Sequence, residues 1–420
     1  MPITLVTEST YGAKIKVIGI GGAGGNAINN MIEKGLDSVD FIALNTDAQD
    51  LDRNLADIKI QIGRNTTQGL GAGMDHTKGA KAVEESREEV ESYLRGSDMV
   101  FIAAGMGGGT GTGGAPEVAR IAKASGALVV GIVTKPFEFE GVDKLRIAEE
   151  GLKKLKQEVD SCIVIPNERL FEIYSEEICF EDCFKKVDDV LYNATRGISD
   201  IITRKGKVNV DFADVKTIMR DMGDALMGIG YAKGEDKAIR AIKEAIDNPL
   251  LEGVSIKGSK SILMNIIADS KFKIAELKRM TELLKDTAGE FSKLIWGVVS
   301  DDRLEDELVV TIIATGFSTS SQVSSTSTKT AMDKINQPVT KNLLFETNQE
   351  AKITKIPTSN QELQHYDIPA VLRNKGDFNT DDLRKITSKN EDLELNLDFD
   401  DENLDLKDLD KPSFLRKQAD

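Results

Sequence analysis

The chain has 420 residues and a mass of 45.8 kDa, more than one hydrophobic core usually serves, so we expect two folded domains and a polar appendage. Its 54 basic and 70 acidic residues give a formal net charge of -16 at pH 7, and this field argues against nucleic-acid binding. Three cysteines cannot form a disulfide framework, and we see no secretory signal or apolar run of membrane-spanning length, so we expect a cytoplasmic protein without a membrane span.

Glycines concentrate in two short stretches, five within residues 19 to 25 and seven within residues 105 to 114. The first stretch follows an apolar run at 14 to 20 and precedes an amphipathic segment at 26 to 34, which predicts a strand, a tight loop and a helix. The second stretch repeats this plan, with a buried strand at 98 to 104 and a helix that we expect to begin at Pro116.

Further short apolar runs alternate with helical stretches, at 41 to 44, 128 to 134 and 161 to 165. This alternation predicts an α/β fold with a parallel sheet. A long helix is expected to follow. After it we expect an α+β domain with strands at 261 to 268 and 307 to 314 and helices at 235 to 246 and 274 to 284.

The composition changes after residue 317. Residues 318 to 364 are rich in Ser, Thr and other polar residues, which bury too little apolar area to offset ordering entropy, and this predicts a flexible linker. Residues 365 to 420 form a tail, in which residues 391 to 410 hold ten acidic residues against one basic residue, with Leu and Phe between them. The role of this acidic block stays open.

The two glycine stretches favour a phosphate ligand. The first fits GxGxxG between a strand and a helix, where amides approach a phosphate at the helix N-terminus. A Rossmann dinucleotide site, with Asp47 on the ribose, and a tight turn without any ligand are the alternatives. The second stretch adds another row of amides and two hydroxyls, which favours a nucleoside triphosphate. Neither stretch contains the lysine of a P-loop.

Eight segments in chain order resemble the bacterial cell-division GTPases of the FtsZ family, in the tubulin superfamily: GIGGAGGNAINNM, NTDAQDL, GLGAGM, FIAAGMGGGTGTGGAP, VTKPFEFEG, IPNERL, NVDFADV and DDRLEDELVVTIIATGF. The resemblance covers residues 14 to 317. It implies a tubulin-like, Rossmann-type GTP-binding domain at 1 to 183, a central helix at 184 to 206, an α+β C-terminal domain at 207 to 317 and a disordered tail. It also implies a head-to-tail homopolymer at the mid-cell division site.

The resemblance implies GTP and GDP contacts at defined positions. Three glycine-rich loops would hold the phosphates, through Gly21, Gly22, Asn26, Gly71, Ala72, Gly73, Gly107, Gly108, Gly109, Thr110 and Gly111. The ribose and base would contact Glu140, Asn167, Phe184 and Asp188, and Lys144 stands at the position of a further phosphate contact. Small residues in the signature loop agree with this, since several N–H groups can converge on one oxyanion.

Two positions depart from the family pattern. Lys144 stands where the family usually has an arginine, so it keeps the charge but loses the planar fork, and Arg146 is an alternative phosphate contact. Asp188 stands where an asparagine often reads the base. An ionised carboxylate can accept from both N1–H and the exocyclic amine of guanine, which suits GTP. The alternative for Asp188 is a solvent-facing acid beside Asp189.

Asn209, Asp211 and Asp214 are the candidate catalytic residues. Asp211 can cap a helix and Asp214 can favour its positive end, which is the simpler account. The resemblance implies instead that this loop enters the nucleotide pocket of the next subunit, where the carboxylates position water and support Mg²⁺. The Mg²⁺ would be bound mainly through the nucleotide, without a dedicated protein metal site.

The tail contains one pattern twice, P-x-[VF]-L-R, at Pro369–Arg373 and Pro412–Arg416. The resemblance implies that such a peptide docks on membrane-tethering and regulatory division proteins, and chance similarity is the alternative. Two other functions stay open for the whole chain. One is a dinucleotide-binding oxidoreductase, and the other is a division paralogue that binds nucleotide without hydrolysing it.

Overall fold

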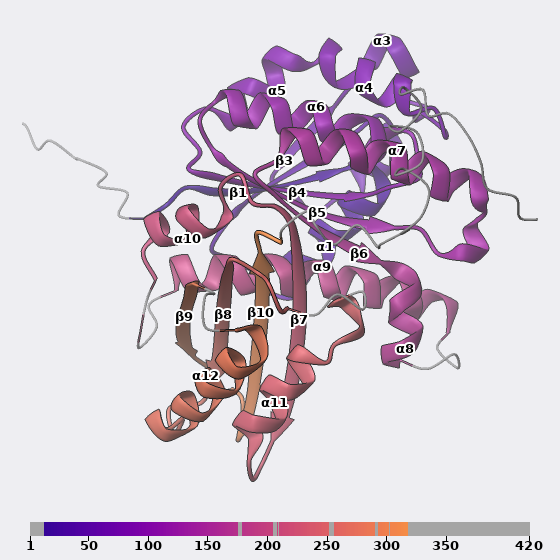
Figure 1. Cartoon of the computed structure of the whole chain (residues 1–420). Helices are drawn as coiled ribbons and strands as arrows, with labels where there is room; N and C mark the ends of the chain where they lie inside the picture. The colour runs from indigo at the N-terminus through magenta and orange to yellow at the C-terminus, as the bar shows by residue number, and fades with distance from the viewer. Residues whose placement is uncertain are drawn as a thin grey trace, which may run out of the picture. The chain divides into compact units, whose positions relative to one another are not determined.

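The computed structural model describes residues 12–174, 179–204, 208, 210–251, 256–289, 293–301 and 303–317. These residues form one ten-stranded sheet with helices on both faces, in the order β3-β2-β1-β4-β5-β6-β7-β10-β8-β9 (Figure 1). Our predictions for Asn209, the linker and the tail peptides lie outside the described residues. In the part of the chain that is described, no helix is long and apolar enough to cross a membrane.

The first six strands are parallel, as predicted for an α/β fold. They are β1 (Ile15–Ile20), β2 (Asp40–Asn45), β3 (Ile58–Gln61), β4 (Met99–Gly105), β5 (Leu128–Lys135) and β6 (Ser161–Pro166). Five of these match predicted apolar runs. The sequence analysis missed β3 because it has only four residues and alternates apolar with polar side chains.

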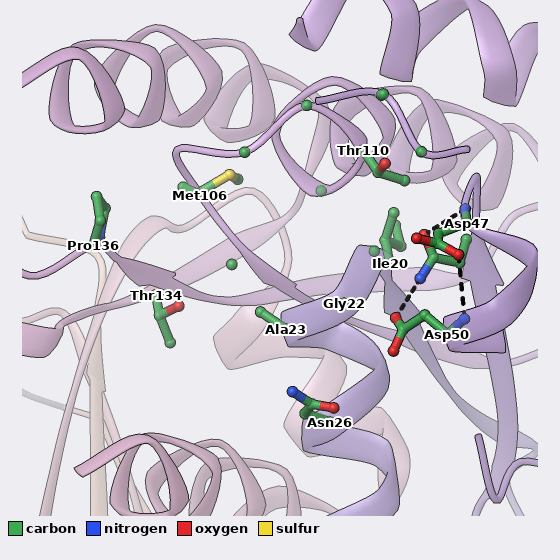
Figure 2. Close-up of a pocket in the computed structure, with 18 of the residues that line it drawn as sticks. Ile20, Gly22, Ala23, Asn26, Asp47, Asp50, Met106, Thr110, Thr134 and Pro136 are labelled. Carbon is green, nitrogen blue, oxygen red and sulfur yellow. Dashed lines mark hydrogen bonds between the residues drawn. The ribbon is translucent and has the colours of Figure 1, made fainter. Parts of the chain in front are cut away.

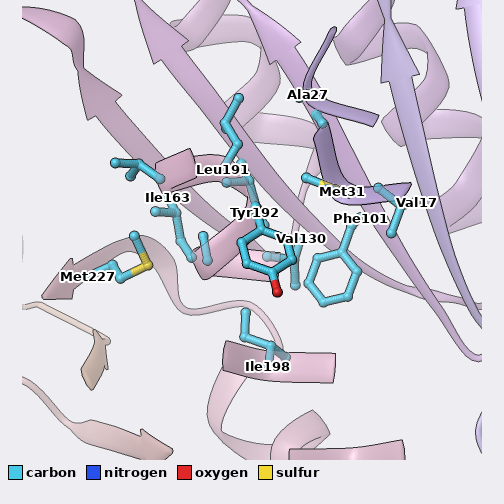
Figure 3. Close-up of a cluster of buried hydrophobic side chains, with 14 of the residues drawn as sticks. Val17, Ala27, Met31, Phe101, Val130, Ile163, Leu191, Tyr192, Ile198 and Met227 are labelled. Carbon is cyan, nitrogen blue, oxygen red and sulfur yellow. The ribbon is translucent and has the colours of Figure 1, made fainter. Parts of the chain in front are cut away.

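Helices cover both faces of the parallel strands, which explains the continuous apolar runs. They are α1 (Gly21–Glu33), α2 (Ala48–Asp52), α3 (Arg64–Thr67), α4 (His76–Glu85), α5 (Arg87–Leu94), α6 (Thr110–Ala124), α7 (Val142–Glu158), α8 (Leu170–Tyr174) and α9 (Phe180–Thr203). Val17 of β1 packs toward α1 and α9 with Phe101 and Leu191 (Figure 3). The adjacent Ile18 belongs to a second core with α4 to α7.

Helices begin earlier in both glycine stretches than predicted, although residues 106 to 109 of the second stretch still form a loop. Helix α1 begins at Gly21 rather than Asn26, and α6 begins at Thr110, so Pro116 lies inside the helix rather than in its first turn. The glycines permit close packing that a side chain would prevent. A Cβ atom at Gly24 would lie 2.4 Å from the carbonyl oxygen of Ala103, so α1 can approach β4 only with glycine there.

Helix α9 occupies Phe180–Thr203, where the sequence predicted a helix at 184 to 206. Two acidic residues, Glu181 and Asp182, stand in its first turn and favour the earlier start. Its apolar face packs in one core with parallel strands and with Leu263 and Ile313 of the C-terminal strands. The domain boundaries themselves stay predictions.

The C-terminal elements are α10 (Phe212–Met219), β7 (Gly223–Lys233), α11 (Lys237–Ile246), β8 (Ser261–Ala268), α12 (Ile274–Ala288), β9 (Lys293–Ser300) and β10 (Glu307–Thr315). Strand β10 pairs antiparallel with β7 and β8, and β9 is parallel to β8. Strand β7 joins this part to β6 through three residue pairs, beginning with Ser161 and Gly223. The predicted α+β character is present, with β7 and β9 as additional strands.

Candidate functional site

A cavity of about 610 Å³ lies at the carboxyl edge of the parallel strands (Figure 2). Its lining includes Gly21 directly after β1, Gly105 at the end of β4, Thr134 near the end of β5 and Asn167 directly after β6. In parallel sheets, ligands bind in crevices at this edge.

Two helix N-termini open onto the cavity. Helices α1 and α6 have 13 and 15 residues, and both begin at residues of the lining. The residues before them, Ile20 and Gly109, make no side-chain cap, and neither first turn holds an acidic residue. The first amides of both helices are therefore left to a ligand. Because each N-terminus also carries the positive end of the helix dipole, the pair fits an anion such as a polyphosphate.

The second glycine loop packs tightly against the loop that contains Gly71, Ala72 and Gly73. A Cβ atom at Gly109 would lie 2.4 Å from the carbonyl oxygen of Gly73 and 2.9 Å from Cβ of Ala72. Thr110 fixes the loop from the other side, with its hydroxyl 2.6 Å from the Thr46 hydroxyl. The absence of a side chain at Gly109 thus brings two loops together at one end of the cavity.

Every residue predicted to contact the nucleotide, except one, lines the cavity. The exception is Gly107, which is not in the lining. Its N–H donates to Oγ1 of Thr112 at 2.8 Å, so this glycine shapes the loop from within. The structure thus brings together residues from three loops, α7, η2 (Asn167–Arg169) and α9.

Two carboxylates lie near the first phosphate loop, and the sequence analysis did not assign them to a triphosphate site. Asp47 caps α2 by accepting from the N–H groups of Gln49 and Asp50 at 2.9 and 3.3 Å. Asp50 accepts from Nδ2 of Asn45 at 2.6 Å. Asn45, Asp47 and Asp50 all line the cavity. All three residues belong to the segment NTDAQDL, whose pattern does not distinguish a carboxylate that caps a helix from one that binds a ligand.

Another part of the wall holds Glu140 and Lys144. Glu140 accepts from the Phe137 N–H at 2.9 Å and from Nζ of Lys144 at 2.9 Å. Arg146 is outside the lining and donates to Glu150 at 3.1 Å. Of the two cations considered for this position, the structure places Lys144 on the cavity.

Asn167 contributes an unpartnered polar atom. Its side chain is 5% exposed, and among the described residues its Oδ1 has no hydrogen-bond partner. A buried acceptor left unsatisfied costs about 1–3 kcal/mol, so a ligand donor at this position would remove that cost. The geometry therefore fits a ligand that carries N–H or O–H groups at this side of the cavity.

Helix α9 supplies a wall that is apolar except for one carboxyl group. Phe184, Val187 and Leu191 line the cavity beside Asp188. The Phe184 ring meets the buried Phe137 ring edge to face, with centroids 5.5 Å apart. Burial, followed by the neighbouring Asp189 charge, raises the pKa of Asp188 to about 7. A half-buried carboxyl group beside apolar side chains suits a flat ring that donates hydrogen bonds.

The predicted catalytic acids lie elsewhere in the same chain. Asp211 and Asp214 are exposed and are not in the cavity lining. Asp211 caps α10 by accepting from the Ala213 N–H at 3.2 Å, so its simpler predicted role is confirmed.

Helix α10 lies at the opposite edge of the sheet from the cavity. At its end the carbonyl oxygen of Met219 accepts from the Ser161 hydroxyl at 2.6 Å, and Ser161 is the first residue of β6. Asn167, in the cavity, follows the last residue of the same strand. In Figure 1, α10 and α8 accordingly lie toward opposite ends of the strands.

Comparison with known proteins gives one consistent result. Residues 14–175 match the GTPase domain of the Tubulin/FtsZ family, and residues 223–318 match the C-terminal domain of the FtsZ family. An empty FtsZ dimer from M. jannaschii is 43% identical with a TM-score of 0.70, over 72% of this chain and 88% of that chain. A mutant of M. jannaschii FtsZ is 42% identical, with a TM-score of 0.70 over 73% and 92%.

A more distant structure has the same fold. CetZ2 from Haloferax volcanii, solved as a GTPgS-bound protofilament, is 22% identical with a TM-score of 0.60, over 72% of this chain and 92% of that chain.

Proposed function

This chain belongs to the FtsZ family of tubulin-type GTPases, and we propose that it assembles head to tail and hydrolyses GTP at the subunit interface. The observation that carries the proposal is the placement of two half-sites on one chain. The anion cavity lies at the carboxyl edge of the parallel strands, and the carboxylates of Asp211 and Asp214 are exposed at the amino edge. Stacked copies would bring one edge against the other.

The phosphates of GTP would bind at the N-termini of α1 and α6. The unpaired amides and helix dipoles supply positive potential there without a lysine from a P-loop. Carboxylate oxygens of Asp47 and Asp50 suit Mg²⁺, which prefers a few protein ligands together with phosphate oxygens. Among the described residues, no group of three or more His, Cys, Asp or Glu side chains could hold a metal.

Guanine would bind against α9. An ionised Asp188 can accept from N1–H and the exocyclic amine, whereas adenine offers a donor beside an acceptor. The ribose and base would also meet Glu140, Asn167 and Phe184, and Asn167 has the unpartnered oxygen that a ligand donor can satisfy. The same contacts would hold GDP after hydrolysis.

Hydrolysis would occur in trans. Phosphoryl transfer depends mostly on positioning and electrostatics, so a cavity that binds phosphates without a positioned water would turn over slowly. In the proposed assembly, Asp211 and Asp214 of one subunit approach the γ-phosphate bound by the next and position the attacking water, with Asn209 orienting them. Assembly then switches the reaction on.

The test is complementation between two inactive variants. Asp214→Ala keeps an intact cavity and lacks the acid, whereas Gly109→Ala keeps the acid and has a distorted cavity. The mixture should hydrolyse GTP faster than the sum of the two separate proteins, because an intact cavity can meet an intact α10. Specific activity of the parent should also rise with protein concentration. No gain on mixing, with full activity of the parent at high dilution, would contradict hydrolysis in trans.

We also propose a role in the division ring, in the cytoplasm at mid-cell. Pro369–Arg373 and Pro412–Arg416 would each fold a small apolar face into a groove of a membrane-tethering or regulatory partner. Deleting either peptide should leave partial recruitment to the membrane in cells, and deleting both should abolish recruitment while GTPase activity in solution persists. Complete loss on removing residues 411 to 420 alone would exclude the upstream copy as a working site.

The two other functions make different predictions. In a dinucleotide-binding oxidoreductase, the carboxylate of Asp47, which caps α2, would also bind a ribose. Preferential binding of NAD over GTP would favour that function. A structural paralogue would bind GTP and show no hydrolysis at any protein concentration.

A further inference from the structure

A polar cluster outside the cavity joins the far end of α1 to α9. Nζ of Lys34, the C-cap residue directly after α1, lies 2.5 Å from Oδ1 of Asp189, and Nδ2 of Asn30 donates to the same oxygen at 3.1 Å. None of these three residues lines the cavity. The cluster therefore needs an explanation other than direct ligand contact.

The cluster continues the polar face of α1 that begins in the cavity. Asn26, Asn30 and Lys34 are spaced by four residues, so they lie on one face of the helix. Asn26 lines the cavity, and the helix extends about 20 Å from its phosphate end to Lys34. A single rigid element thus connects the proposed phosphate site to the cluster.

On α9, the residue held by the cluster is adjacent to the one that faces the cavity. Asp189 contacts α1, and Asp188 lines the cavity. Successive helical residues differ by about 100° in direction, so fixing Asp189 against α1 also fixes the direction of Asp188.

Tyr192 makes a second contact with Lys34. Its side chain is buried in the core between α1, α9 and the sheet (Figure 3), and Nζ of Lys34 lies 5.0 Å from its ring centroid. This cation–π contact and the ion pair both restrain the lysine, which is about one-third exposed. The restraint is stronger than that of a surface ion pair with one partner.

We propose that Lys34, acting through Asp189, is a positioning residue for guanine recognition by Asp188. It ties the helix that binds the phosphates to the helix that reads the base, so that the two ends of one nucleotide are recognised at a fixed separation. The inference rests on the proposed function. Lys34 also opposes the effect of Asp189 on the neighbouring carboxyl group, which favours the charge state that accepts from guanine.

The experiment compares GTP and ATP binding at equal Mg²⁺, by calorimetry on the full chain below its assembly concentration. Lys34→Met keeps the apolar stem and removes the charge. It should weaken GTP binding by about fivefold, the loss expected for one partly buried charged contact, and leave ATP binding unchanged, because ATP gains nothing from Asp188. Lys34→Arg keeps the charge and should retain most of the preference for GTP.

A matched control is Lys186→Met. Nζ of Lys186 lies 3.9 Å from Oδ2 of Asp189, but both residues belong to α9, so this pair does not connect the helix to α1. The control should keep the GTP-to-ATP preference of the parent. Thermal unfolding of every variant identifies a loss that comes from instability.

The outcomes separate this inference from the proposed function. A parent that binds ATP as tightly as GTP would overturn both. A parent that prefers GTP, with an unchanged preference in Lys34→Met, would overturn only the positioning role. Equal weakening of GTP and ATP in Lys34→Met would also overturn it, because that pattern indicates a general structural effect.

Discussion

At the carboxyl edge of the parallel strands the cavity is built largely from backbone groups, whereas at the amino edge α10 presents side-chain carboxylates. The first edge leaves two helix N-termini uncapped, and the second caps its helix with Asp211. Uncapped amides can bind an anion but offer no general base. The carboxylates of Asp211 and Asp214 can position water, but their negative charge prevents them from binding a phosphate. The cavity also holds Asp47 and Asp50, but both accept hydrogen bonds from neighbouring groups, so we assign the positioning of water to the exposed acids of α10.

The largest effect should come from removing a carboxylate at the amino edge. Asp214→Ala should lower GTPase activity by about 100-fold or more if it positions water, while GTP binding persists because the cavity is untouched. Steady-state phosphate release and equilibrium binding measure the two quantities. Thr217→Ala, one turn further along the same exposed face of α10, serves as the control and should stay active. Normal turnover by Asp214→Ala would remove α10 from the reaction.

Adding a side chain to the glycine loop at the carboxyl edge should produce the second-largest effect. In Gly109→Ala, Cβ would meet the Gly73 carbonyl oxygen at 2.4 Å, so the two loops must separate. Overpacking costs about 1–3 kcal/mol, which corresponds to a loss of about 5- to 150-fold in GTP affinity. Gly25→Ala is a control on α1 outside the lining, since its Cβ would meet only the end of the Asn54 side chain. Equal GTP affinity in Gly109→Ala and the parent would contradict the phosphate role of this loop.

A pH titration tests Asp188, whose pKa is raised by burial in the cavity wall. Guanine requires ionised Asp188, whose pKa is about 7, so GTP affinity should be full above pH 7 and fall as the pH decreases through it. Affinity at pH 6 should be about tenfold weaker than at pH 8. ATP corrects for titration of the phosphates, and Asp188→Asn should lose the additional slope. Parallel profiles for GTP and ATP in the parent would exclude Asp188 as the base contact.

The smallest effect should come from the partly buried ion pair of Lys144 and Glu140 in the cavity wall. Lys144→Ala removes a half-exposed charge that Glu140 already neutralises, so GTP affinity should fall only about two- to fivefold. Arg146→Ala, on the same helix and outside the lining, should leave the affinity unchanged. A greater loss in Arg146→Ala than in Lys144→Ala would show that the bound nucleotide recruits the arginine.

The sequence predicted the elements whose signal is local. Apolar runs located β1, β2, β4, β5, β6, β8 and β10, since buried strands need little besides continuous hydrophobicity. Strand β7 was missed because Gly228 and Gly230 interrupt its apolar pattern, and these glycines are explained by the close approach of α11.

The residues that line the cavity were predicted less directly than the strands. Composition and glycine spacing indicated a triphosphate, but Glu140, Asn167 and Asp188 came from family resemblance, because single polar residues carry no pattern of their own. The separation of α10 from the cavity was implied only by the family resemblance, because no local pattern in the sequence indicates it. It depends on a contact between Met219 and Ser161, which are 58 positions apart.

The core that α9 shares with both sets of strands has a consequence for synthesis on the ribosome. Ile198 and Ile201 of α9 are buried in one cluster with Leu263 and Ile313, which are translated much later. At about 5–20 residues per second, the roughly 110 residues between the end of α9 and the end of β10 take on the order of 6–22 seconds to appear. During that interval the apolar face of α9 lacks its partners from the C-terminal strands and is exposed to solvent. A chaperone that covers apolar surface would therefore have more to bind on the nascent chain than on the finished protein, in which Ile198 and Ile201 are buried.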